Sequence, residues 1–444
     1  MRDKPKILLI SPTGMDKEGN PIIQRKTYLP GLTMPQLAAV TPKDFDVTIV
    51  AETSEPIPWD DDWDLVGLTG MGGSGLARGF QIADIFRKKG VKVVIGGMAA
   101  TLFEPEYALA HCDVLMRGEA DETWPIMLND FKKGTLKSVY NMEKAPDIRN
   151  FPTPAYDKLN LKYYGFWRPV QATRGCPFPC TFCTISAFFK RSYRKRPVDQ
   201  VVRDVRAAKA SGSKYIAFID DNIGVDFNYC KELFTALIPE KIIWISQCSL
   251  HLAEDEELLA LASRSGCRIL SFGIETTNES SLMHVEKEWN RPERYDSAFI
   301  KIKAAGIEVS TEMIVGLDGD DETVFDETFD FIMRNSIALP RNYIITPVPG
   351  TPMYKGLDAE GRIFDKDYSK YVGGTVVFEP KNMSVETLQN GYWSLYKKLY
   401  STKNILRRLK RNHANLSPYM RLFVFGTNLV YQNHIRRGIT PGIV

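Results

Sequence analysis

The stretch Arg174-Gly175-Cys176-Pro177-Phe178-Pro179-Cys180-Thr181-Phe182-Cys183 decides the fold, and it directly follows a run at 169–173 that predicts a strand. Its three cysteines lie close enough in sequence for their thiolates to converge on one iron–sulfur cluster. Three protein ligands leave one iron of a four-iron cluster open, so a small molecule can coordinate it and react there. The flanking prolines disfavour a helix and keep the loop extended.

A zinc site or a disulfide pair is the alternative for these cysteines. A structural zinc ion needs a fourth ligand, and the nearest candidates, Cys230, Cys248 and His251, lie a full unit downstream. The four cysteines outside the motif, at 112, 230, 248 and 267, show no pairing pattern. That scatter suits a reducing cytoplasm, and the sequence therefore favours the cluster.

The motif C-x-x-x-C-x-aromatic-C resembles the signature of the radical S-adenosylmethionine (radical-SAM) superfamily. In that superfamily it lies at the mouth of the first strand of a partial (β/α) barrel. Cys176, Cys180 and Cys183 match the cluster ligands, and Phe182 matches the aromatic residue that flanks the adenine. The resemblance implies a four-iron four-sulfur cluster and S-adenosyl-L-methionine (SAM) as cofactors, with an external electron donor of the flavodoxin or ferredoxin type.

Composition bounds the class of protein. A chain of 444 residues should divide into two or three domains. Its 44% hydrophobic and 25% charged residues are typical of a soluble globular protein, and a net charge of +3 does not imply nucleic acid. The start resembles no signal peptide, and no apolar run reaches transmembrane length. We expect a cytoplasmic protein.

Residues 1–135 alternate short apolar strands with helical patterns, which predicts a Rossmann-like domain with a parallel sheet. Strands are expected at 7–11, 47–51, 65–69, 91–96 and 114–116, and helices at 34–40, 76–89, 105–110 and 122–131. Glycine-rich turns follow at 67–75, 96–101 and 117–120. A dinucleotide site is disfavoured, because G-x-G-x-x-G does not follow the first strand.

This layout resembles the cobalamin-binding domain that precedes many radical-SAM cores. The matching motifs are D-x-V-G-L-(S/T) at 64–69, V-V-x-G-G-x-x-A-T at 93–101 and a G-E-x-E-T-type turn at 118–123. The resemblance assigns cobalamin contacts to Thr69, Gly70, Gly72, Gly96, Gly97, Thr101, Gly118 and Glu119. The D-x-H-x-x-G motif is absent, so no histidine of the first loop would bind cobalt. A degenerate Rossmann domain with purely structural glycines is the alternative.

Residues 136–166 carry three prolines and little periodicity, which predicts a linker. Residues 167–365 then read as a partial (β/α)6 barrel, in which chemistry gathers at the carboxyl ends of strands. Strands are expected at 170–174, 215–219, 242–247, 269–274, 309–315 and 342–346, and helices at 198–210, 228–237, 255–265, 292–305 and 322–334.

Polar residues follow these strands. The resemblance places Asp220, Asp221 and Asn222 at the amino end of the methionine moiety of SAM, although a helix cap is the alternative. It places Ser246 and Gln247 at the ribose.

Two carboxylates belong to later strands. Glu275, in Gly273-Ile274-Glu275, matches a family pattern for ribose or carboxylate contact. Glu312 alternates inward on the fifth strand and could bind substrate or pair with a buried arginine.

Residues 366–444 predict a mainly helical C-terminal domain. It resembles the extension of cobalamin-type radical enzymes that modify hopanoids and related lipids. Positive charge at 406–411, Arg421, Arg436 and Arg437 alternates with Leu, Phe and Tyr. Such a segment can touch the inner face of an anionic membrane peripherally, and a solvated helix packed on the barrel is the favoured alternative.

Together these features predict an α/β protein with a Rossmann-like cobalamin-binding domain, a partial radical-SAM barrel and a helical extension. The resemblance implies a cobalamin-dependent C-methyltransferase that uses a 5′-deoxyadenosyl radical on an apolar small molecule, such as a lipid or tetrapyrrole. A ring-forming or carbon–carbon-coupling enzyme is one alternative. An iron–sulfur electron-transfer or binding module without enzyme activity is the other.

Overall fold

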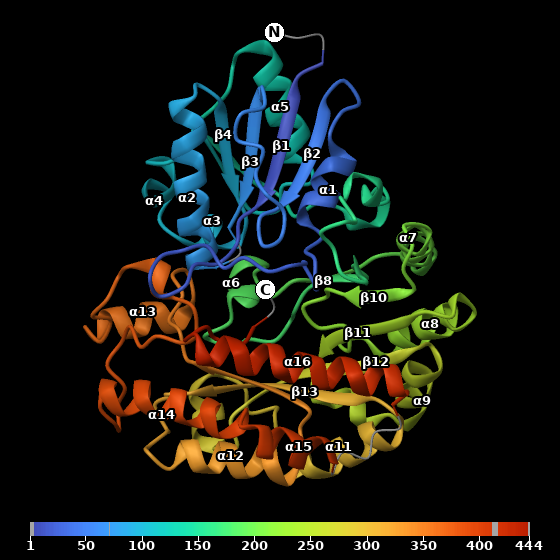
Figure 1. Cartoon of the computed structure of the whole chain (residues 1–444), viewed down its shortest axis with the longest axis vertical. Coiled ribbons are helices and arrows are strands. Elements are labelled where there is room, and N and C mark those ends of the chain that lie inside the picture. The colour runs from blue at the N-terminus through green and yellow to red at the C-terminus, as the bar shows by residue number, and fades with distance from the viewer. Residues whose placement is uncertain (1–3, 71, 411–415, 443–444) are drawn as a thin grey trace.

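The computed structural model describes residues 4–70, 72–410 and 416–442, and Figure 1 shows two α/β units stacked along its long axis. The upper sheet is entirely parallel, with strand order β2-β1-β3-β4-β5-β6. Its strands are β1 (Lys6–Ser11), β2 (Asp46–Ala51), β3 (Leu65–Thr69), β4 (Lys92–Gly96), β5 (Val114–Arg117) and β6 (Val139–Asn141). Its helices are α1 (Thr33–Val40), α2 (Gly73–Lys88), α3 (Met98–Leu102), α4 (Pro105–Leu109) and α5 (Thr123–Lys133).

The five strands predicted for this sheet are confirmed to within one residue at either end. The central strand β1 is buried on both faces, as parallel strands covered by helices require. The order of the sheet reverses at β1, so a crevice is expected beyond the carboxyl ends of β1 and β3. The segment predicted as a linker contributes β6, which at three residues is too short for a periodic pattern.

The lower sheet is also parallel and adds its strands in chain order, β7-β10-β11-β12-β13-β14, which leaves β7 and β14 as its edges. Its strands are β7 (Trp167–Val170), β10 (Tyr215–Phe218), β11 (Ile243–Cys248), β12 (Cys267–Glu275), β13 (Glu308–Val315) and β14 (Leu339–Ile344). The helices between them are α7 (Val198–Ala210), α8 (Phe227–Leu237), α9 (Glu256–Arg264), α10 (Glu279–His284), α11 (Tyr295–Ala304) and α12 (Val324–Arg334).

The first predicted strand of this sheet needs a correction. The run at 170–174 is divided between β7 and a separate strand, β8 (Thr173–Gly175), which pairs antiparallel with β9 (Tyr193–Lys195). The division occurs because the backbone N–H groups of Ala172 and Thr173 donate to the Asp220 carboxylate instead of to a neighbouring strand.

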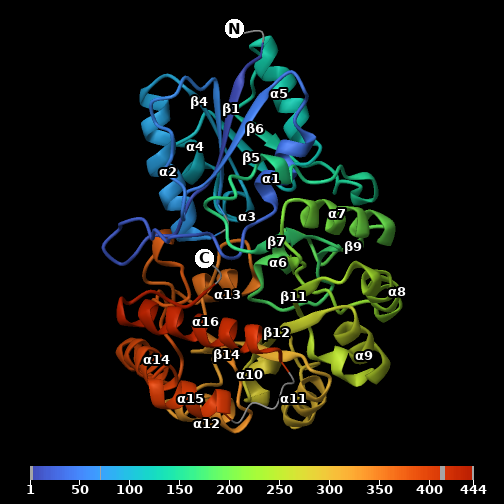
Figure 2. The ribbon, with the colours of Figure 1, turned by 45° about the vertical axis from the view of Figure 1, so that its right-hand side comes forward.

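The C-terminal helices are α13 (Pro352–Ala359), α14 (Val385–Leu399), α15 (Thr402–Lys410) and α16 (Pro418–Arg436). Helix α14 covers the edge strand β14. The hydroxyls of Tyr396 in this helix and of Tyr400 directly after it donate to the carbonyl oxygens of Asn342 and Pro340 at 2.7 and 2.5 Å. Figure 2 shows α14, α15 and α16 gathered on one side of the lower unit. Across the described ranges no helix is both long and apolar enough to cross a membrane.

Candidate active site

The cysteine loop joins β8 to the short helix α6 (Thr184–Phe188). Cys183 directly precedes α6, and its N–H donates to the Cys180 carbonyl oxygen at 3.1 Å. Burial raises the pKa of the Cys180 thiol to about 12 and that of the Cys183 thiol to about 11. Both thiols are therefore protonated at neutral pH until a metal displaces the proton.

The described residues contain no group of three or more His, Cys, Asp or Glu side chains arranged to hold a metal ion. This absence applies to a single metal ion, such as the zinc ion considered above, because such an ion needs all of its ligands around one point. A four-iron cluster binds each thiolate to a different iron and does not require this convergence. The donor set of three cysteines fits a cluster with one open iron.

Acidic residues at the carboxyl end of β10 fasten the loop that carries the cysteines. The fully buried Asp220 accepts hydrogen bonds from Ala172 N–H and from both the N–H and the hydroxyl of Thr173. Asp221 accepts one from Gly175 N–H at 2.8 Å. Burial raises the pKa of Asp220 to about 7 and that of Asp221 to about 6. These two carboxylates therefore act on the loop backbone.

Asn222 is the member of this triplet that reaches a cysteine. Its side-chain amide nitrogen lies 3.8 Å from the Cys176 sulfur, and its oxygen accepts from Ser249 N–H at 2.9 Å. The second contact fixes the direction of the amide, so its N–H groups face the cysteine loop. The hydrogen bond to sulfur is the kind of contact that tunes a cluster.

Glu275 and Lys287 form a buried ion pair next to the cysteine loop, and each side chain is only 8% exposed. Glu275 ends β12 with a φ of +65°, an uncommon conformation for a residue other than glycine. A Cβ at Gly273 would approach the Glu275 carboxylate to 2.6 Å, so glycine leaves room for the pair. The positive charge of Lys287 lowers the pKa of the Cys180 thiol against the dominant effect of burial.

The three remaining residues that were predicted to contact SAM differ in their burial. Ser246 donates to the Phe218 carbonyl oxygen at 3.0 Å and is buried within the sheet, whereas Gln247 is half-buried. Phe182 is half-buried against the core. Their contact with SAM stays a prediction.

A second ion pair in the lower sheet joins the buried Arg341 to the partly exposed Glu312. Arg341 on β14 donates to Glu312 on β13 at 2.6 Å and to the Ser271 hydroxyl at the same distance. Of the two interpretations of Glu312, pairing with a buried arginine is therefore confirmed. Its side chain remains 30% exposed, so one carboxylate oxygen is available to a further group.

The upper sheet carries an unsatisfied polar group at its carboxyl edge. Thr69 ends β3, and its buried hydroxyl makes no hydrogen bond with any described residue. Gly97, with a φ of +101°, lies directly beside it, because a Cβ there would come within 2.7 Å of the Thr69 hydroxyl and the Gly70 carbonyl oxygen. A buried hydroxyl without a partner, beside a half-buried glycine turn, is a group that a bound ligand can satisfy.

The three predicted glycine turns meet at this edge. Gly70 N–H donates to the Gly96 carbonyl oxygen at 2.9 Å, which joins the first two turns. The Thr101 hydroxyl donates to the Gly97 carbonyl oxygen and accepts from Gly118 N–H, at 2.8 and 2.9 Å, which joins the third. Gly72 precedes α2 as its N-cap. The motifs predicted to bind cobalamin thus form one continuous surface of loops.

Glu119 connects this surface to the cysteine loop. Its carboxylate binds Arg174 at 2.8 Å and Arg194 at 2.6 Å, and Asp121 binds Arg174 at 2.6 Å. Arg174 and Arg194 stand opposite each other on the β8–β9 ribbon. Because Arg174 is separated from Cys176 by one residue, the end of β5 is tied to the start of the cysteine loop.

Sequence reasoning missed the partners in these contacts. It assigned no role to Arg174, Arg194, Asp121 or Lys287. The position of Arg174 just before the first cysteine was the available signal. It also missed an aromatic stack, in which Phe178 of the loop lies 4.1 Å from Trp289 and Trp289 lies 5.3 Å from His251, measured between ring centroids.

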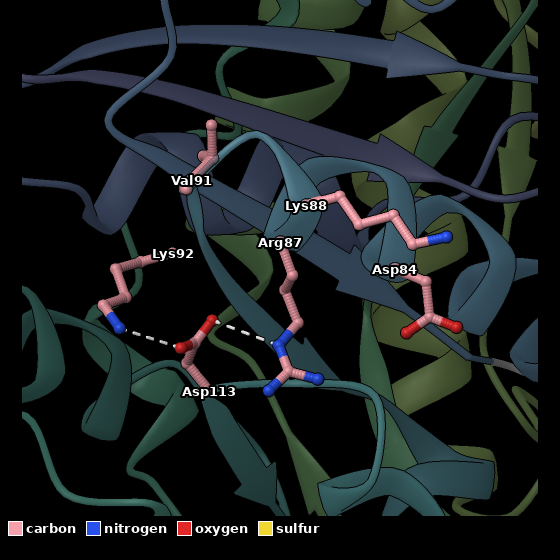
Figure 3. A pocket seen from close by; sticks show the side chains of 7 residues that line it. Asp84, Arg87, Lys88, Val91, Lys92 and Asp113 are labelled. Carbon is pink, nitrogen blue, oxygen red and sulfur yellow. Dashed lines mark hydrogen bonds and ion pairs between the residues drawn. The ribbon is translucent and has the colours of Figure 1, made fainter.

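A surface hollow of about 440 Å³ lies elsewhere, between the end of α2 and the start of β4 (Figure 3). Its charged side chains neutralise each other, since Asp113 pairs with Lys92 at 2.9 Å and with Arg87 at 3.7 Å. Lys92 begins β4 and Gly96 ends it, so the hollow is at the edge of the sheet opposite the glycine turns.

Family models match two parts of the chain. Residues 170–332 match the radical SAM superfamily, and residues 351–427 match a domain of unknown function, DUF4070. The first match contains the cysteine loop and the strands β10 to β13 of the lower sheet. The fold and the loop thus define a radical-SAM enzyme.

Two relatives cover nearly the whole chain. Bacteriochlorophyllide d C-12(1)-methyltransferase of Chlorobaculum tepidum is 31% identical over 92% of this chain and 89% of its own length. Bacteriochlorophyllide d C-8(2)-methyltransferase of the same organism is 28% identical over 89% of this chain and 91% of its own. The chain belongs to the family of radical-SAM enzymes with a cobalamin-binding domain, and its activity is of the C-methyltransferase type.

A solved structure shares the fold over almost its full length. TsrM of Kitasatospora setae, a radical S-adenosylmethionine methyltransferase determined with tryptophan and a SAM analogue, superposes with a TM-score of 0.70. The match covers 98% of both chains at 14% identity, so it concerns the fold alone. Another structure of TsrM contains cobalamin and a [4Fe–4S] cluster.

Proposed function

We propose that this protein transfers a methyl group to a carbon atom of an apolar small molecule of the tetrapyrrole or polycyclic lipid class. The supporting observation is the Glu119–Arg174 contact, which holds the glycine turns of the upper sheet against the cysteine loop of the lower one. We assign cobalamin to a domain at 1–135, the cluster and SAM to a barrel at 167–365, and substrate selection partly to a helical domain at 366–444.

The lower site fits the cluster and SAM. A four-iron cluster supplies, when bound, the electron that cleaves SAM to methionine and a 5′-deoxyadenosyl radical. Cys176, Cys180 and Cys183 would hold it, Asn222 orients a hydrogen bond toward the Cys176 sulfur, and the Glu275–Lys287 pair provides charges next to the cysteine loop. An external donor of the flavodoxin or ferredoxin type delivers the electron.

The upper site fits cobalamin, which supplies, when bound, a transferable methyl group. The Thr69 hydroxyl is free to bind it, Gly97 leaves space for its close approach, and the backbone around Thr101 and Gly118 lines the same edge. The first loop carries no histidine, so the protein leaves the lower face of cobalt without an imidazole from that loop.

The class of substrate rests on the relatives, whose names specify bacteriochlorophyllide d. The partly exposed Glu312, fixed by Arg341, can accept a hydrogen bond from a polar group on an otherwise apolar ligand. We further propose that the protein is cytoplasmic and contacts the membrane peripherally, because an apolar substrate partitions into lipid.

Anaerobic reconstitution tests the proposal. Wild-type protein should show the optical spectrum of a cluster, retain added cobalamin through gel filtration, and form deoxyadenosine and a methylated product. Its Co(II) electron-resonance spectrum should lack nitrogen superhyperfine splitting.

The cysteines supply the matched controls. Cys176→Ala should abolish deoxyadenosine formation, whereas Cys230→Ala should keep it, because Cys230 lies outside the three-cysteine motif, is fully buried and donates to the Ile223 carbonyl oxygen. Full cleavage by Cys176→Ala would contradict the cluster assignment. Cleavage with a ring-closed or coupled product and no methylation would favour the alternative enzyme. Absence of deoxyadenosine under strong reductant would leave only an electron-transfer module.

A further inference from the structure

Helix α16 bridges the open side of the barrel. Its inner face shares a hydrophobic cluster with one edge of the lower sheet: Met420 and Val424 belong to it together with Leu339 of β14. Near its other edge, Phe423 lies edge-on to Trp167 of β7, with ring centroids 5.7 Å apart. Figures 1 and 2 both show the helix running across the front of the barrel.

The outer face of α16 carries four exposed apolar side chains beside the exposed Asn433 and Arg436. The exposed fractions of Tyr419, Leu422, Leu429 and Val430 are 46%, 67%, 41% and 42%. Spacings of three, seven and eight residues place these side chains on one face of the helix. A helix that packs by one face in water normally presents polar groups on the other, so this stripe of four residues is suited to an apolar environment.

The segment of chain that carries the stripe has only positive charges. Residues 387–444 contain ten Lys and Arg residues and no Asp or Glu, although the whole chain carries only +3. Arg421 and Arg436 of α16 and Arg437 directly after it are exposed. An apolar stripe bordered by cations, without acidic residues in the same segment, is complementary to the surface of an anionic bilayer.

Helix α15, for which the sequence predicted a basic membrane contact, presents fewer exposed cations than expected. Arg408 is fully buried, and its guanidinium donates to the Leu399 carbonyl oxygen at 2.6 Å and to the Asn428 side chain at 2.8 Å. It therefore ties α15 to α16 instead of facing solvent. Arg407 remains exposed, and Arg411 lies outside the described residues.

We propose that α16 is a membrane-docking element, with the four-residue stripe inserted among the acyl chains and the three arginines at anionic headgroups. This inference rests on the proposed function, because only an apolar, membrane-dissolved substrate makes such docking useful. Docking would bring the open side of the barrel to the place where that substrate is concentrated.

Vesicle co-sedimentation of the full chain tests the docking. Wild type should pellet with phosphatidylcholine vesicles containing phosphatidylglycerol more than with pure phosphatidylcholine, and rising salt should reduce the difference. Leu422→Ser/Leu429→Ser should weaken pelleting at every salt concentration. Arg436→Glu/Arg437→Glu should weaken it at low salt by at least about fivefold per residue.

The matched controls are Ile126→Ser and Lys133→Glu in α5, at the far end of the molecule, and both should pellet as wild type does (Figure 2). Equal pelleting on the two lipids, or none, would overturn the proposal. A wild-type dimer that Leu422→Ser dissociates would also overturn it, because the stripe would then bind a second copy of the chain. Deoxyadenosine formation, measured in the same preparations without lipid, reports separately on the proposed function.

Discussion

Glu119→Gln should loosen the cysteine loop, because one carboxylate holds two arginines at the junction of the sheets. The Glu119 side chain is 5% exposed and binds Arg174 and Arg194 at 2.8 and 2.6 Å. Glutamine keeps the shape but removes the charge that balances these guanidinium groups. Breaking a buried ion pair costs about 3–5 kcal/mol. Since Asp121 still binds Arg174 at 2.6 Å, we expect the low end of that range.

Hydrogen exchange of peptides covering 172–184 measures this effect, because it reports local opening of the loop. A loss of about 3 kcal/mol corresponds to an exchange rate raised by about two orders of magnitude. The control is Glu254→Gln, which removes a half-exposed pair with Arg294 and should cost less than about 1 kcal/mol. Unchanged exchange at 172–184 in Glu119→Gln would refute the claim that this contact positions the loop.

Two further substitutions test the upper site and the lower unit. Gly97→Ala should abolish cobalamin retention on gel filtration, because its Cβ would lie 2.7 Å from the Thr69 hydroxyl; Gly90→Ala, also at positive φ but in open space, should retain it. Burial raises the pKa of Asp320 to about 6, so the folded state holds a proton that the unfolded state releases near pH 4. This group alone should therefore lower the unfolding free energy by about 1.3 kcal/mol from pH 5 to pH 7, in addition to the decreases that the raised pKa values of Asp220 and Asp221 cause. Asp320→Asn can keep the hydrogen bonds to Ser281 and two backbone N–H groups. In urea titrations its unfolding free energy should therefore fall less than that of wild type by the Asp320 share; an equal decrease in the two proteins would contradict the pKa assignment.

Much of the fold could be predicted because its signals are local. Parallel strands buried on both faces form continuous apolar runs, so the five upper strands and the five later strands of the lower sheet were found from sequence. The cysteine loop was found for a similar reason, since its ligands lie within eight consecutive residues. Short elements such as β6 and α3 carry too few residues to show a period, and they were missed.

The partners of the charged residues could not be predicted in the same way. Glu119 stays a predicted cobalamin contact, but its ion pairs with Arg174 and Arg194, which lie 55 and 75 residues away in the chain, were not anticipated. Arg408 was expected in solvent, but its guanidinium lies between the end of α14 and α16, where it donates to the Leu399 carbonyl oxygen and to the Asn428 side chain. A charged side chain looks alike in sequence whether it faces water or an opposite charge, because its partner comes from a distant segment.

The sequence by itself therefore determined the class of chemistry, through three closely spaced cysteines, and the α/β architecture, through the periodicity of its apolar runs. Only the tertiary structure decided how the sheets are joined, which carboxylates hold the loop backbone, and which face of the C-terminal helices remains apolar in solvent. The physical reason is that spacing and periodicity act over a few residues, whereas burial and charge pairing depend on which distant segments the fold brings into contact.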